Sequence, residues 1–585
     1  MNSETKQCQN CKNPFTIEPE DFAFYEKMRV PPPTLCPDCR YRRRLANRNE
    51  WNFYKTACGL CAKDMVSIYN PQYAGPVYCQ PCWWSDKWDP FAYGLEFDFS
   101  RTFFEQFQEM RLAVPHVAMA NTQSVNSEYT NQSLSNRNSF MLVSSEYCEN
   151  CLYGYWNNKA RECVDCYSVE QAELLYESLN CTNCSRSAYL EDCVDSTGSY
   201  FLKDCKGCAS CFGCYGLRNK SHYWHNEQLS KDEYERRRRD FVFSRTNIGK
   251  EREALRDLEE RFPHKYYRGK NIINSSGDYI QDTKNTYLAF NCRDVEYLRY
   301  CQDVWRSKDS LDCTEAYAEL SYESEGVIAN GSIGITKGFP VFNSYYSELC
   351  FNVHDVFGCV GVRKAEYCIL NRRYDKAEYE HLRDKIIAHM RETKEWGEFF
   401  PAENSLFAYN ETVAQDYFPL NEGEVRVRGL RWYRRDERDY KVTLKPGDIP
   451  QTIGEASDAI LNETIGCVSQ EDPQARAKYL NCATAFRITP MELELYRKMN
   501  MLIPQKCSVC RRQDRMALRN PRKLWQRSCQ CKGGGSEKGI YKNAVEHFHG
   551  APPAGGPCPN SFSTTYAAER EEVVYCEQCY QSELG

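Results

Sequence analysis

The middle of the chain, from about residue 115 to 373, lacks the long amphipathic runs that mark helices. Its apolar positions are mostly Tyr, Cys and Val, set among Ser and Asn. Short runs of this composition favour strands joined by turns. The pattern therefore predicts a mainly β region.

Short units recur in this region with a period of about 21 to 22 residues, which lies in the range of repeat architectures. In its second half they divide the sequence evenly, at residues 285–305, 306–327, 328–349 and 350–371, and Cys292 and Cys313 fall 21 apart. Such repeats are typical of solenoids, in which only stacking of the units makes a core. We predict a right-handed parallel β-helix in two segments, β-solenoid A at 115–228 and β-solenoid B at 269–373. An irregular all-β sandwich is the alternative.

The two predicted solenoids are related to each other at an offset of 145 residues. The sequence Phe212-Gly-Cys-Tyr-Gly-Leu-Arg in the first resembles Phe357-Gly-Cys-Val-Gly-Val-Arg in the second. A charged run of helical character follows each, at 231–241 and at 376–393. We expect a helical linker at 229–268, and a helix with an irregular linker at 374–460.

Paired CxxC motifs precede the first predicted solenoid. Their cysteines form two quartets, Cys8, Cys11, Cys36 and Cys39, and then Cys58, Cys61, Cys79 and Cys82. Each quartet offers four thiolates from two short turns, which is a ligand set that structural Zn²⁺ prefers. The second spacing lies in the usual range for zinc sites and the first slightly exceeds it. We predict zinc ribbon 1 at 1–50 and zinc ribbon 2 at 51–95.

The C-terminal part repeats this arrangement 471 positions later. Identities at this one offset run from Phe15 and Phe486 to Asn49 and Asn520. Tyr479 stands at the position of Cys8, so Cys467 is the nearest upstream thiol. We predict zinc ribbon 3 at 461–522, and a three-cysteine site is the alternative. Its expected ligands are Cys467, Cys482, Cys507 and Cys510.

The last predicted module, zinc ribbon 4 at 523–585, is a distorted copy of zinc ribbon 2. Cys576 and Cys579 match Cys79 and Cys82, and Cys558 takes the place of Cys61. A Gly-, His- and Pro-rich insertion at about 532–557 splits the first motif. Either Cys529 or Cys531 should complete the ligand set, and His547 and His549 are weaker candidates that we expect in an exposed loop.

Composition bears on the compartment and the cofactor. The 585 residues include 34 cysteines, and there is neither an apolar N-terminal run nor an apolar stretch long enough to cross a bilayer. In a reducing compartment, metal ligation and burial explain so many thiols better than disulfides do. We expect a cytoplasmic protein with about four structural Zn²⁺ ions and no membrane partner.

The cysteines of the predicted solenoids permit three interpretations. Cys148 and Cys151, or the run from Cys205 to Cys214 with a cysteine at every third position, are spaced like metal or iron–sulfur ligands. A solenoid, however, repeats its inward positions, and Cys is compact and readily buried. We expect stacked buried thiols, with additional zinc or a cluster as alternatives.

A basic helix is expected after the second motif of zinc ribbons 1 and 3. Such helices could contact phosphates with little sequence choice, and nearby aromatic residues, Tyr41, Trp51, Tyr54 and Trp525, could stack on bases. Because the net charge is only −6, local patches would have to recruit nucleic acid. We expect nucleic acid or a ribonucleoprotein as the partner. The alternative is that these arginines form a solvated helix face or pair with the chain's many acids. The candidate cations are Arg40, Arg42, Arg43, Arg44, Arg48, Arg511, Arg512, Arg515, Arg519, Arg522, Lys523 and Arg527.

Two other functions compete with this one. A protein-interaction or self-assembly scaffold would use the face of a solenoid. A carbohydrate-active or hydrolytic enzyme could use a row of acids, but the chain lacks a nucleophile elbow, a phosphate-binding Gly-rich loop and an HExxH motif. We assign no catalytic residue and favour a non-enzymatic scaffold. The acids of that row are Glu315, Glu319, Glu323 and Glu325.

Several motifs resemble those of a known family. Phe-x-Ile-x-Pro, Tyr-x-Lys-Met and Pro-x-x-Cys-x-x-Cys-Arg occur at both ends, and Phe407-Ala-Tyr-Asn-Glu-Thr-Val-Ala lies between them. Over nearly its whole length the chain resembles large zinc-ribbon (treble-clef-type) proteins of unknown function from reduced-genome bacteria of the candidate phyla. The resemblance implies zinc binding and brings no catalytic residues. Tyr479 and Cys531 depart from the repeated pattern.

Overall fold

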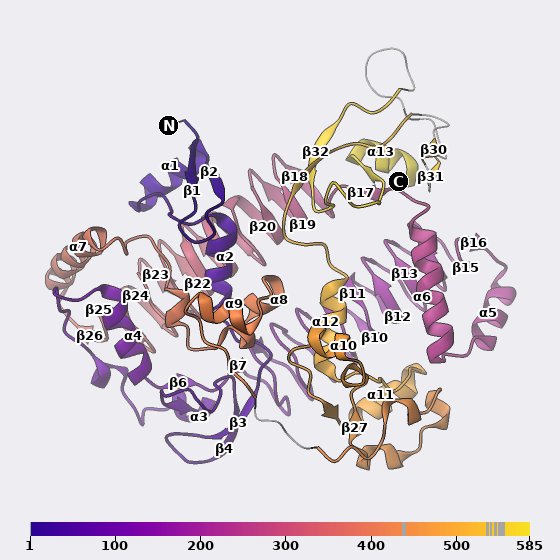
Figure 1. The fold of residues 1–585 in the computed structure, drawn as a ribbon, viewed down its shortest axis with the longest axis horizontal. Coiled ribbons are helices and arrows are strands. Elements are labelled where there is room, and N and C mark those ends of the chain that lie inside the picture. Colours follow the sequence, from indigo (N-terminus) through magenta and orange to yellow (C-terminus); the bar gives the residue numbers. More distant parts are fainter. Residues whose placement is uncertain are drawn as a thin grey trace.

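The computed structural model describes residues 2–435, 440–533, 537–538, 541–542, 547 and 556–584. Two stacks of mostly parallel strands dominate the fold, and cysteine-containing modules from both ends of the chain pack on them (Figure 1). Within the described ranges, no helix combines the length and the apolar character needed to cross a membrane.

Two cysteine modules form the N-terminal part. Cysteine module 1 contains β1 (Glu4–Gln7), β2 (Pro14–Ile17), α1 (Pro19–Met28) and α2 (Pro37–Leu45). Cysteine module 2 contains β3 (Tyr54–Ala57), β4 (Asp64–Ser67), β5 (Val77–Tyr78) and α3 (Gln80–Trp83). In each module an antiparallel hairpin precedes the helices. Module 2 is followed by η1 (Pro90–Tyr93), α4 (Phe103–Ala113) and β6 (His116–Val117).

Stack A follows directly. Its strands are β7 (Asn121–Thr122), β8 (Ser133–Leu134), β9 (Tyr167–Glu170), β10 (Glu173–Tyr176), β11 (Leu179–Thr182), β12 (Ser185–Glu191), β13 (Tyr200–Lys203), β14 (Phe212–Tyr215), β15 (Tyr223–Trp224) and β16 (Glu227–Gln228). Two helices, α5 (Lys231–Asp240) and α6 (Arg245–Glu259), come next, and α6 packs on β13 and β14.

Stack B is the longer-stranded of the two. After β17 (His264–Lys265), its strands are β18 (Gly269–Ile273), β19 (Gly277–Lys284), β20 (Ala289–Arg299), β21 (Trp305–Glu319), β22 (Tyr322–Asn330), β23 (Val341–Phe342), β24 (Phe351–Phe357), β25 (Arg363–Ile369) and β26 (Arg372–Arg373). The linker after it contains α7 (Lys376–Glu392), η2 (Ala402–Asn404), η3 (Tyr409–Glu411), α8 (Val413–Tyr417), α9 (Glu422–Val427), η4 (Pro446–Asp448), η5 (Ile453–Glu455) and η6 (Asp458–Asn462).

The C-terminal modules repeat the N-terminal ones. Cysteine module 3 contains β27 (Ile465–Gly466), η7 (Val468–Gln470), α10 (Pro473–Lys478), β28 (Ala485–Phe486), α11 (Pro490–Met499) and α12 (Ser508–Ala517). Cysteine module 4 contains β29 (Trp525–Ser528), β30 (Glu537–Lys538), β31 (Tyr541–Lys542), β32 (Ser561–Thr564), β33 (Val574–Tyr575) and α13 (Glu577–Leu584). Helices α1 and α11 both begin at a proline, and both end at a residue with a positive φ, Arg29 and Asn500. This start and stop chemistry is local, so the duplicated sequence produces the same helix twice.

The register of both stacks is regular and short. In stack A a residue lies beside the one 12 positions later, as Leu179 does with Tyr167 and Glu191, and single bridges such as Val143 with Tyr155 continue this offset. In stack B the offset is the same between β19 and β20 and one position shorter between β21 and β22. The predicted longer repeat is therefore wrong.

The spacing of Cys292 and Cys313 shows how the longer repeat arose. The Cys292 thiol donates to the carbonyl of Cys301, 9 residues on, and the backbone N–H of Cys313, 12 residues further, donates to the Cys301 sulfur. The spacing of 21 residues is thus the sum of two separations, 9 residues from Cys292 to Cys301 and 12 residues from Cys301 to Cys313. It is not the length of a structural unit.

A three-residue period underlies the register of stack A. From Gln123 to His225 every third residue has a positive φ, between +43° and +70°. Non-glycine residues seldom adopt this conformation, and Asn and Asp adopt it more readily than others. Many of these positions hold Asn, Asp or Gly. Each such residue turns the backbone, so four three-residue segments fill one offset of 12.

The residues that follow these turning positions form the interior of stack A. From Ser127 to Cys214 every third residue is buried, and most are Ser, Cys, Ala or other small side chains. The Cys151 thiol, for example, donates to the carbonyls of Glu149 and Ala160 at 3.4 Å. The CxxC spacing in stack A thus follows from the three-residue period. Among the residues that the structure describes, no stack cysteine belongs to a group of converging metal-ligand atoms, which favours buried thiols.

The terminal modules pack on the stacks crosswise. Module 1 lies on stack B, where the rings of Tyr25 and Tyr322 are 5.6 Å apart. Module 3 lies on stack A, where the equivalent rings of Tyr496 and Tyr176 are 5.8 Å apart. In Figure 1, α2 accordingly lies by the strands of stack B and α12 by those of stack A. Each end of the chain therefore holds the stack that is more distant from it in sequence.

Candidate metal centres and docking surfaces

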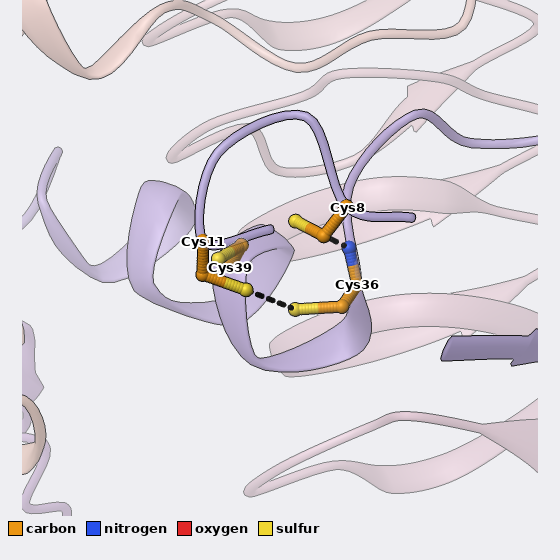
Figure 2. A group of neighbouring side chains, drawn as sticks. All are labelled: Cys8, Cys11, Cys36 and Cys39. Atoms are coloured by element: carbon orange, nitrogen blue, oxygen red, sulfur yellow. Dashed lines mark hydrogen bonds between the residues drawn. The ribbon is translucent and has the colours of Figure 1, made fainter. Parts of the chain in front are cut away.

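Four cysteine quartets converge in the structure. In each, the four sulfur atoms lie within 4.8 Å of one another, and Figure 2 shows those of module 1 pointing toward a common centre. The four quartets are Cys8, Cys11, Cys36 and Cys39; Cys58, Cys61, Cys79 and Cys82; Cys467, Cys482, Cys507 and Cys510; and Cys529, Cys558, Cys576 and Cys579.

The sulfur separations fit a tetrahedral metal ion. Zn–S bonds of ~2.3 Å in a tetrahedron place the sulfur atoms ~3.8 Å apart. The sulfurs of Cys11 and Cys36 are 3.7 Å apart, and those of Cys482 and Cys507 are 3.8 Å apart. Modules 2 and 4 each contain a pair at 3.9 Å. The residues present therefore fit structural metal binding by four thiolates.

One hydrogen bond recurs in all four modules and identifies equivalent ligands. The backbone N–H of the third cysteine donates to the sulfur of the first, at 3.2 to 3.3 Å. The donor and acceptor pairs are Cys36 and Cys8, Cys79 and Cys58, Cys507 and Cys467, and Cys576 and Cys529. Cys467 thus occupies the place of Cys8, and Cys529, rather than Cys531, that of Cys58.

Backbone geometry prepares these sulfurs for metal binding. Cys36 caps the N-terminus of α2, a position where the helix dipole favours a thiolate, although the neighbouring Cys39 sulfur and burial raise the pKa of Cys36. At Cys8, burial raises the pKa of the thiol, but backbone N–H donors from Cys36 and Cys11 outweigh burial and lower that pKa to about 6. Cys58 has the same balance and also a pKa of about 6.

Cys531 and His547 form a separate group with Cys579. Their ligand atoms also lie within 4.8 Å of one another. The side chain of His547 is 2% exposed, so the expectation that it lies in an exposed loop is wrong, because the imidazole packs against the fourth quartet. His549 lies outside the described residues.

The arginines of α2 dock module 1 onto stack B. Arg40 Nε lies 2.8 Å from Asp312, and Arg44 lies 3.1 Å from Asp312 and 2.8 Å from Glu323. All four side chains are at most 1% exposed. Burial alone would lower the pKa of Arg40, but Asp312 holds it above its usual value. The ion pairs thus fix α2 on the sheet.

Module 3 repeats this docking on stack A. Arg511 and Arg515 of α12, the counterparts of Arg40 and Arg44, each lie 2.8 Å from Asp165. Arg522 further on pairs with Asp303 of stack B at 2.7 Å. The module therefore contacts both stacks through its basic residues.

The structure places most of these cations in the interior. The sequence left two roles open for them, contact with phosphates or pairing with the chain's own acids, and Arg40, Arg44, Arg48, Arg511 and Arg515 are buried. The reason is that carboxylates distant in sequence neutralise them. Other members are also engaged, as follows: Arg43 with Glu323 and Glu398, Arg48 with Glu50 and Glu315, Arg512 with Asp416, Arg519 with Tyr167 and Tyr417, and Arg527 with the carbonyls of Ala567 and Glu572. Arg42 is half-buried and Lys523 is exposed.

The proposed base-stacking residues are largely interior as well. Tyr41 and Tyr54 are buried, and the ring of Trp51 packs on Tyr155 with the Arg512 guanidinium 4.9 Å from its centre. Two rings of this set lie beside an exposed cation, Trp525 beside Lys523 and the buried Tyr54 beside Arg435. These rings stabilise the docked modules.

Two acids of the row in stack B, Glu315 and Glu323, serve the same docking. Glu315 pairs with Arg48, and Glu323 pairs with Arg43 and Arg44. Glu325 is 1% exposed, and burial raises its pKa to about 7. Glu319 differs, because it is exposed and accepts a hydrogen bond from Asn330. Glu315 and Glu323 are therefore occupied by arginines.

An exposed apolar stripe runs along stack B. It comprises Tyr317, Ile328, Phe339, the half-buried Phe351 and, from module 2, Trp84. At its other end the half-buried Trp305 packs against Trp156 of stack A. Tyr317, Ile328 and Phe339 are 36%, 43% and 39% exposed. Tyr317 pairs with Ile328 in the register of the sheet. The rings of Phe339 and Phe351 are 6.2 Å apart, and those of Phe351 and Trp84 are 4.8 Å apart. The backbone N–H of Ile328 donates to the carbonyl of Gly338, so Ile328 and Phe339 lie on neighbouring turns and the two parts of the stripe adjoin. Sequence reasoning missed this surface because about a whole turn of the stack separates each of its stack B members from the next.

A cavity of about 710 Å³ lies where the two halves of the molecule cross. Its walls include Tyr41 of α2, Tyr167 of stack A and Tyr417 of α8. Two of the cations beside it have partners, since Arg522 pairs with Asp303 and Arg519 donates to Tyr417. The cavity is therefore bounded by the same contacts that dock the modules.

Comparisons with known proteins add little to this geometry. No family model matches the chain, and no curated protein matches it. Twenty-three chains of solved structures match. One is a crystal structure of a proposed acetyltransferase from Desulfovibrio desulfuricans G20, at 8% identity over 44% of this chain and 71% of that chain, with a TM-score of 0.09. A likeness at this TM-score carries no argument about fold or function.

Proposed function

We propose that this protein is a zinc-binding, non-enzymatic scaffold in which the four cysteine modules clamp two β-solenoids together. The observation that carries the proposal is the position of the arginines that follow the second cysteine pair of modules 1 and 3. In modules 1 and 3 they lie buried against carboxylates of a stack. A zinc ion in each module would hold the helix that presents them.

The solenoid part of the proposal rests on register. Successive strands pair in parallel at a nearly constant offset, and the interior positions recur with the same period. In a solenoid each turn contacts only its neighbours, and exposed ends need capping. The terminal modules would then provide lateral support that the narrow, small-residue interior of stack A cannot.

Zinc has a structural role in this proposal. Four thiolates complete the tetrahedral shell, so no position is left for a water molecule or a substrate. The sulfur separations of 3.7 to 3.9 Å support the assignment. The relation to zinc-ribbon proteins of the candidate phyla belongs to the same proposal and is supported by the duplicated cysteine modules.

A protein partner fits the exposed surface better than nucleic acid does. The apolar stripe of stack B is flanked by charged side chains such as Lys308 and Glu296, and apolar patches with polar rims typically bind other proteins. Phosphate binding by Arg40 or Arg511 would require breaking buried ion pairs, at a cost of roughly 3–5 kcal/mol for each uncompensated charge. We therefore favour the protein-interaction function, with the stripe as the contact surface.

Two measurements on the full-length protein test the proposal. Elemental analysis should find at least four zinc ions per chain, and removal of zinc with a chelator should expose α2 and α12 to protease. The ratio of absorbance at 260 and 280 nm, before and after a high-salt wash, should show no bound nucleic acid. Fewer than four zinc ions would refute the metal assignment, and nucleic acid released by salt would favour the alternative partner.

The stripe is tested by substitution. Ile328→Glu places a charge in the middle of the stripe, and Lys308→Glu is the matched control on the next three-residue segment of stack B, beyond the turn at Arg306. Sedimentation velocity at increasing concentration, and chemical crosslinking in cells followed by mass spectrometry, should show protein contacts that Ile328→Glu removes and Lys308→Glu keeps. Equal behaviour of the two variants would exclude the stripe as the contact surface.

A further inference from the structure

Module 4 contains more candidate metal ligands than one zinc ion needs. Beside its quartet, the ligand atoms of Cys531, His547 and Cys579 lie within 4.8 Å of one another, and Cys579 belongs to both groups. The side chains of Cys531 and Cys579 are fully buried and that of His547 is 2% exposed. A second group of candidate metal ligands therefore adjoins the fourth quartet and shares the sulfur of Cys579 with it.

A buried carboxylate orients the imidazole of this second group. His547 Nε2 lies 2.9 Å from Glu583 Oε2, and both side chains are at most 2% exposed. The other ring nitrogen, Nδ1, lies 3.1 Å from the sulfur of Cys531. A carboxylate that accepts a hydrogen bond from one ring N–H keeps the proton on that nitrogen and leaves the other nitrogen free to bind a metal ion, which is the usual arrangement of metal-binding histidines. Glu583 thus sets the tautomer that a metal site requires.

We propose that module 4 holds two metal ions, with the Cys579 thiolate as the bridge between them. The first ion takes Cys529, Cys558, Cys576 and Cys579, as in the other modules. The second takes Cys531, His547 and Cys579, which leaves one position of a tetrahedron for a small ligand such as water. The inference rests on the proposed zinc binding of the four quartets and adds a fifth site of a different type.

Charge favours the second ion. Four thiolates around one Zn²⁺ carry a formal charge of about −2, and such a charge is costly to bury without compensation. A second Zn²⁺ adds two positive charges while Cys531 loses its proton, so the net formal charge of the site changes from about −2 to about −1. Mixed sulfur and imidazole ligands suit Zn²⁺ and Co²⁺.

Comparison with module 2 shows where the extra ligands come from. At the offset of 471 residues, Leu60 stands at the position of Cys531, so module 2 has no fifth sulfur there. The segment between the first two ligands is also much longer in module 4, from Cys529 to Cys558, than in module 2, and it carries His547. The second site is thus a property of module 4, and module 2 serves as an internal control.

Elemental analysis of the full-length protein after dialysis tests the proposal. We expect five zinc ions per chain in the wild type, and four in Cys531→Leu, which introduces the residue of module 2, and in His547→Gln. His354→Ala, which changes a half-exposed histidine, should keep five. Co²⁺ substitution gives a second readout, because a bridging thiolate couples two Co²⁺ ions and weakens their electron paramagnetic resonance signal. Cys531→Leu should restore the uncoupled signal.

The outcomes separate this inference from the proposed function. Four zinc ions in the wild type and in both variants would overturn the second site and leave the four quartets in place. Five zinc ions that persist in both variants would also overturn it, because the fifth ion would be bound elsewhere. Fewer than four in the wild type would refute the proposed function itself.

Discussion

Removing the carboxylate of Asp312 tests the docking of module 1 directly. Asp312 is fully buried and pairs with both Arg40 and Arg44. In Asp312→Ala the Arg40 guanidinium loses its carboxylate, and Arg44 retains the Glu323 carboxylate and the Thr314 hydroxyl. Breaking a buried ion pair from one side typically costs about 3–5 kcal/mol, because the remaining charge is left uncompensated. We expect a cost of this size, localised at the contact between α2 and stack B.

The matched control lies on the same stack and contacts the same module. Asp309 pairs with Lys27 of α1 at 3.3 Å, but these side chains are 32% and 52% exposed. Water and salt screen such a pair, so Asp309→Ala should cost at most about 1 kcal/mol. The two variants remove the same functional group and differ in burial.

Hydrogen exchange of the α2 amides is the appropriate assay, because it measures local opening. A cost of about 3–5 kcal/mol raises the open population by roughly two to four orders of magnitude. Asp312→Ala should therefore accelerate exchange in α2 strongly and leave α12 unchanged, whereas Asp165→Ala should do the reverse. Equal exchange in Asp312→Ala and Asp309→Ala would refute the reasoning, since it would mean that the buried guanidinium groups can reach water.

Three further outcomes are expected. Cys36→Ser should unfold module 1 locally, seen as protease cleavage near α2, while module 3 stays protected; uniform protection would contradict this. Burial raises the pKa of Glu325 from 4.5 to about 7, so the carboxyl stabilises the fold while protonated, and this stability is lost as pH rises through 7. Thermal unfolding at pH values from 4.5 to 8 should show that the wild type loses about 3 kcal/mol of unfolding free energy over this range and that Glu325→Gln does not. Parallel pH dependences of the two proteins would contradict this prediction. Ile328→Glu should change the unfolding midpoint little, because Ile328 is 43% exposed; a large drop would show that the stripe is part of the core.

The cysteine groups and several helices could be predicted from the sequence, because they depend on residues close together in the chain. The CxxC spacings and the 471-residue offset predicted the four cysteine groups, because short turns present most of the sulfurs. The place of Cys467 was predicted because it is the nearest upstream thiol. The charged runs at 231–241 and 376–393 correspond to α5 (Lys231–Asp240) and α7 (Lys376–Glu392). Caps and helical periodicity are properties of consecutive residues, so they need no knowledge of the tertiary structure.

The sequence also contained the three-residue period of stack A, which the interpretation by longer repeats missed. Small residues at every third position from Ser127 to Cys214, interleaved with Asn, Asp and Gly, mark its buried and turning positions. The CxxC pairs in this region belong to the same period. Their resemblance to metal knuckles arises because both features place cysteines three residues apart.

Only the tertiary structure decided what the charged residues do. Arg40 and Asp312 are 272 positions apart, and Arg511 and Asp165 are 346 apart, so nothing near either arginine in sequence reveals its partner. An arginine-rich helix looks the same whether it faces phosphate, solvent or a buried carboxylate. The fold settled that choice by wrapping each end of the chain over the distant stack, where desolvation makes an unpaired charge costly and a paired one specific. The choice between Cys529 and Cys531 followed the same rule, because it depended on which sulfur the returning chain brings within reach of Cys576.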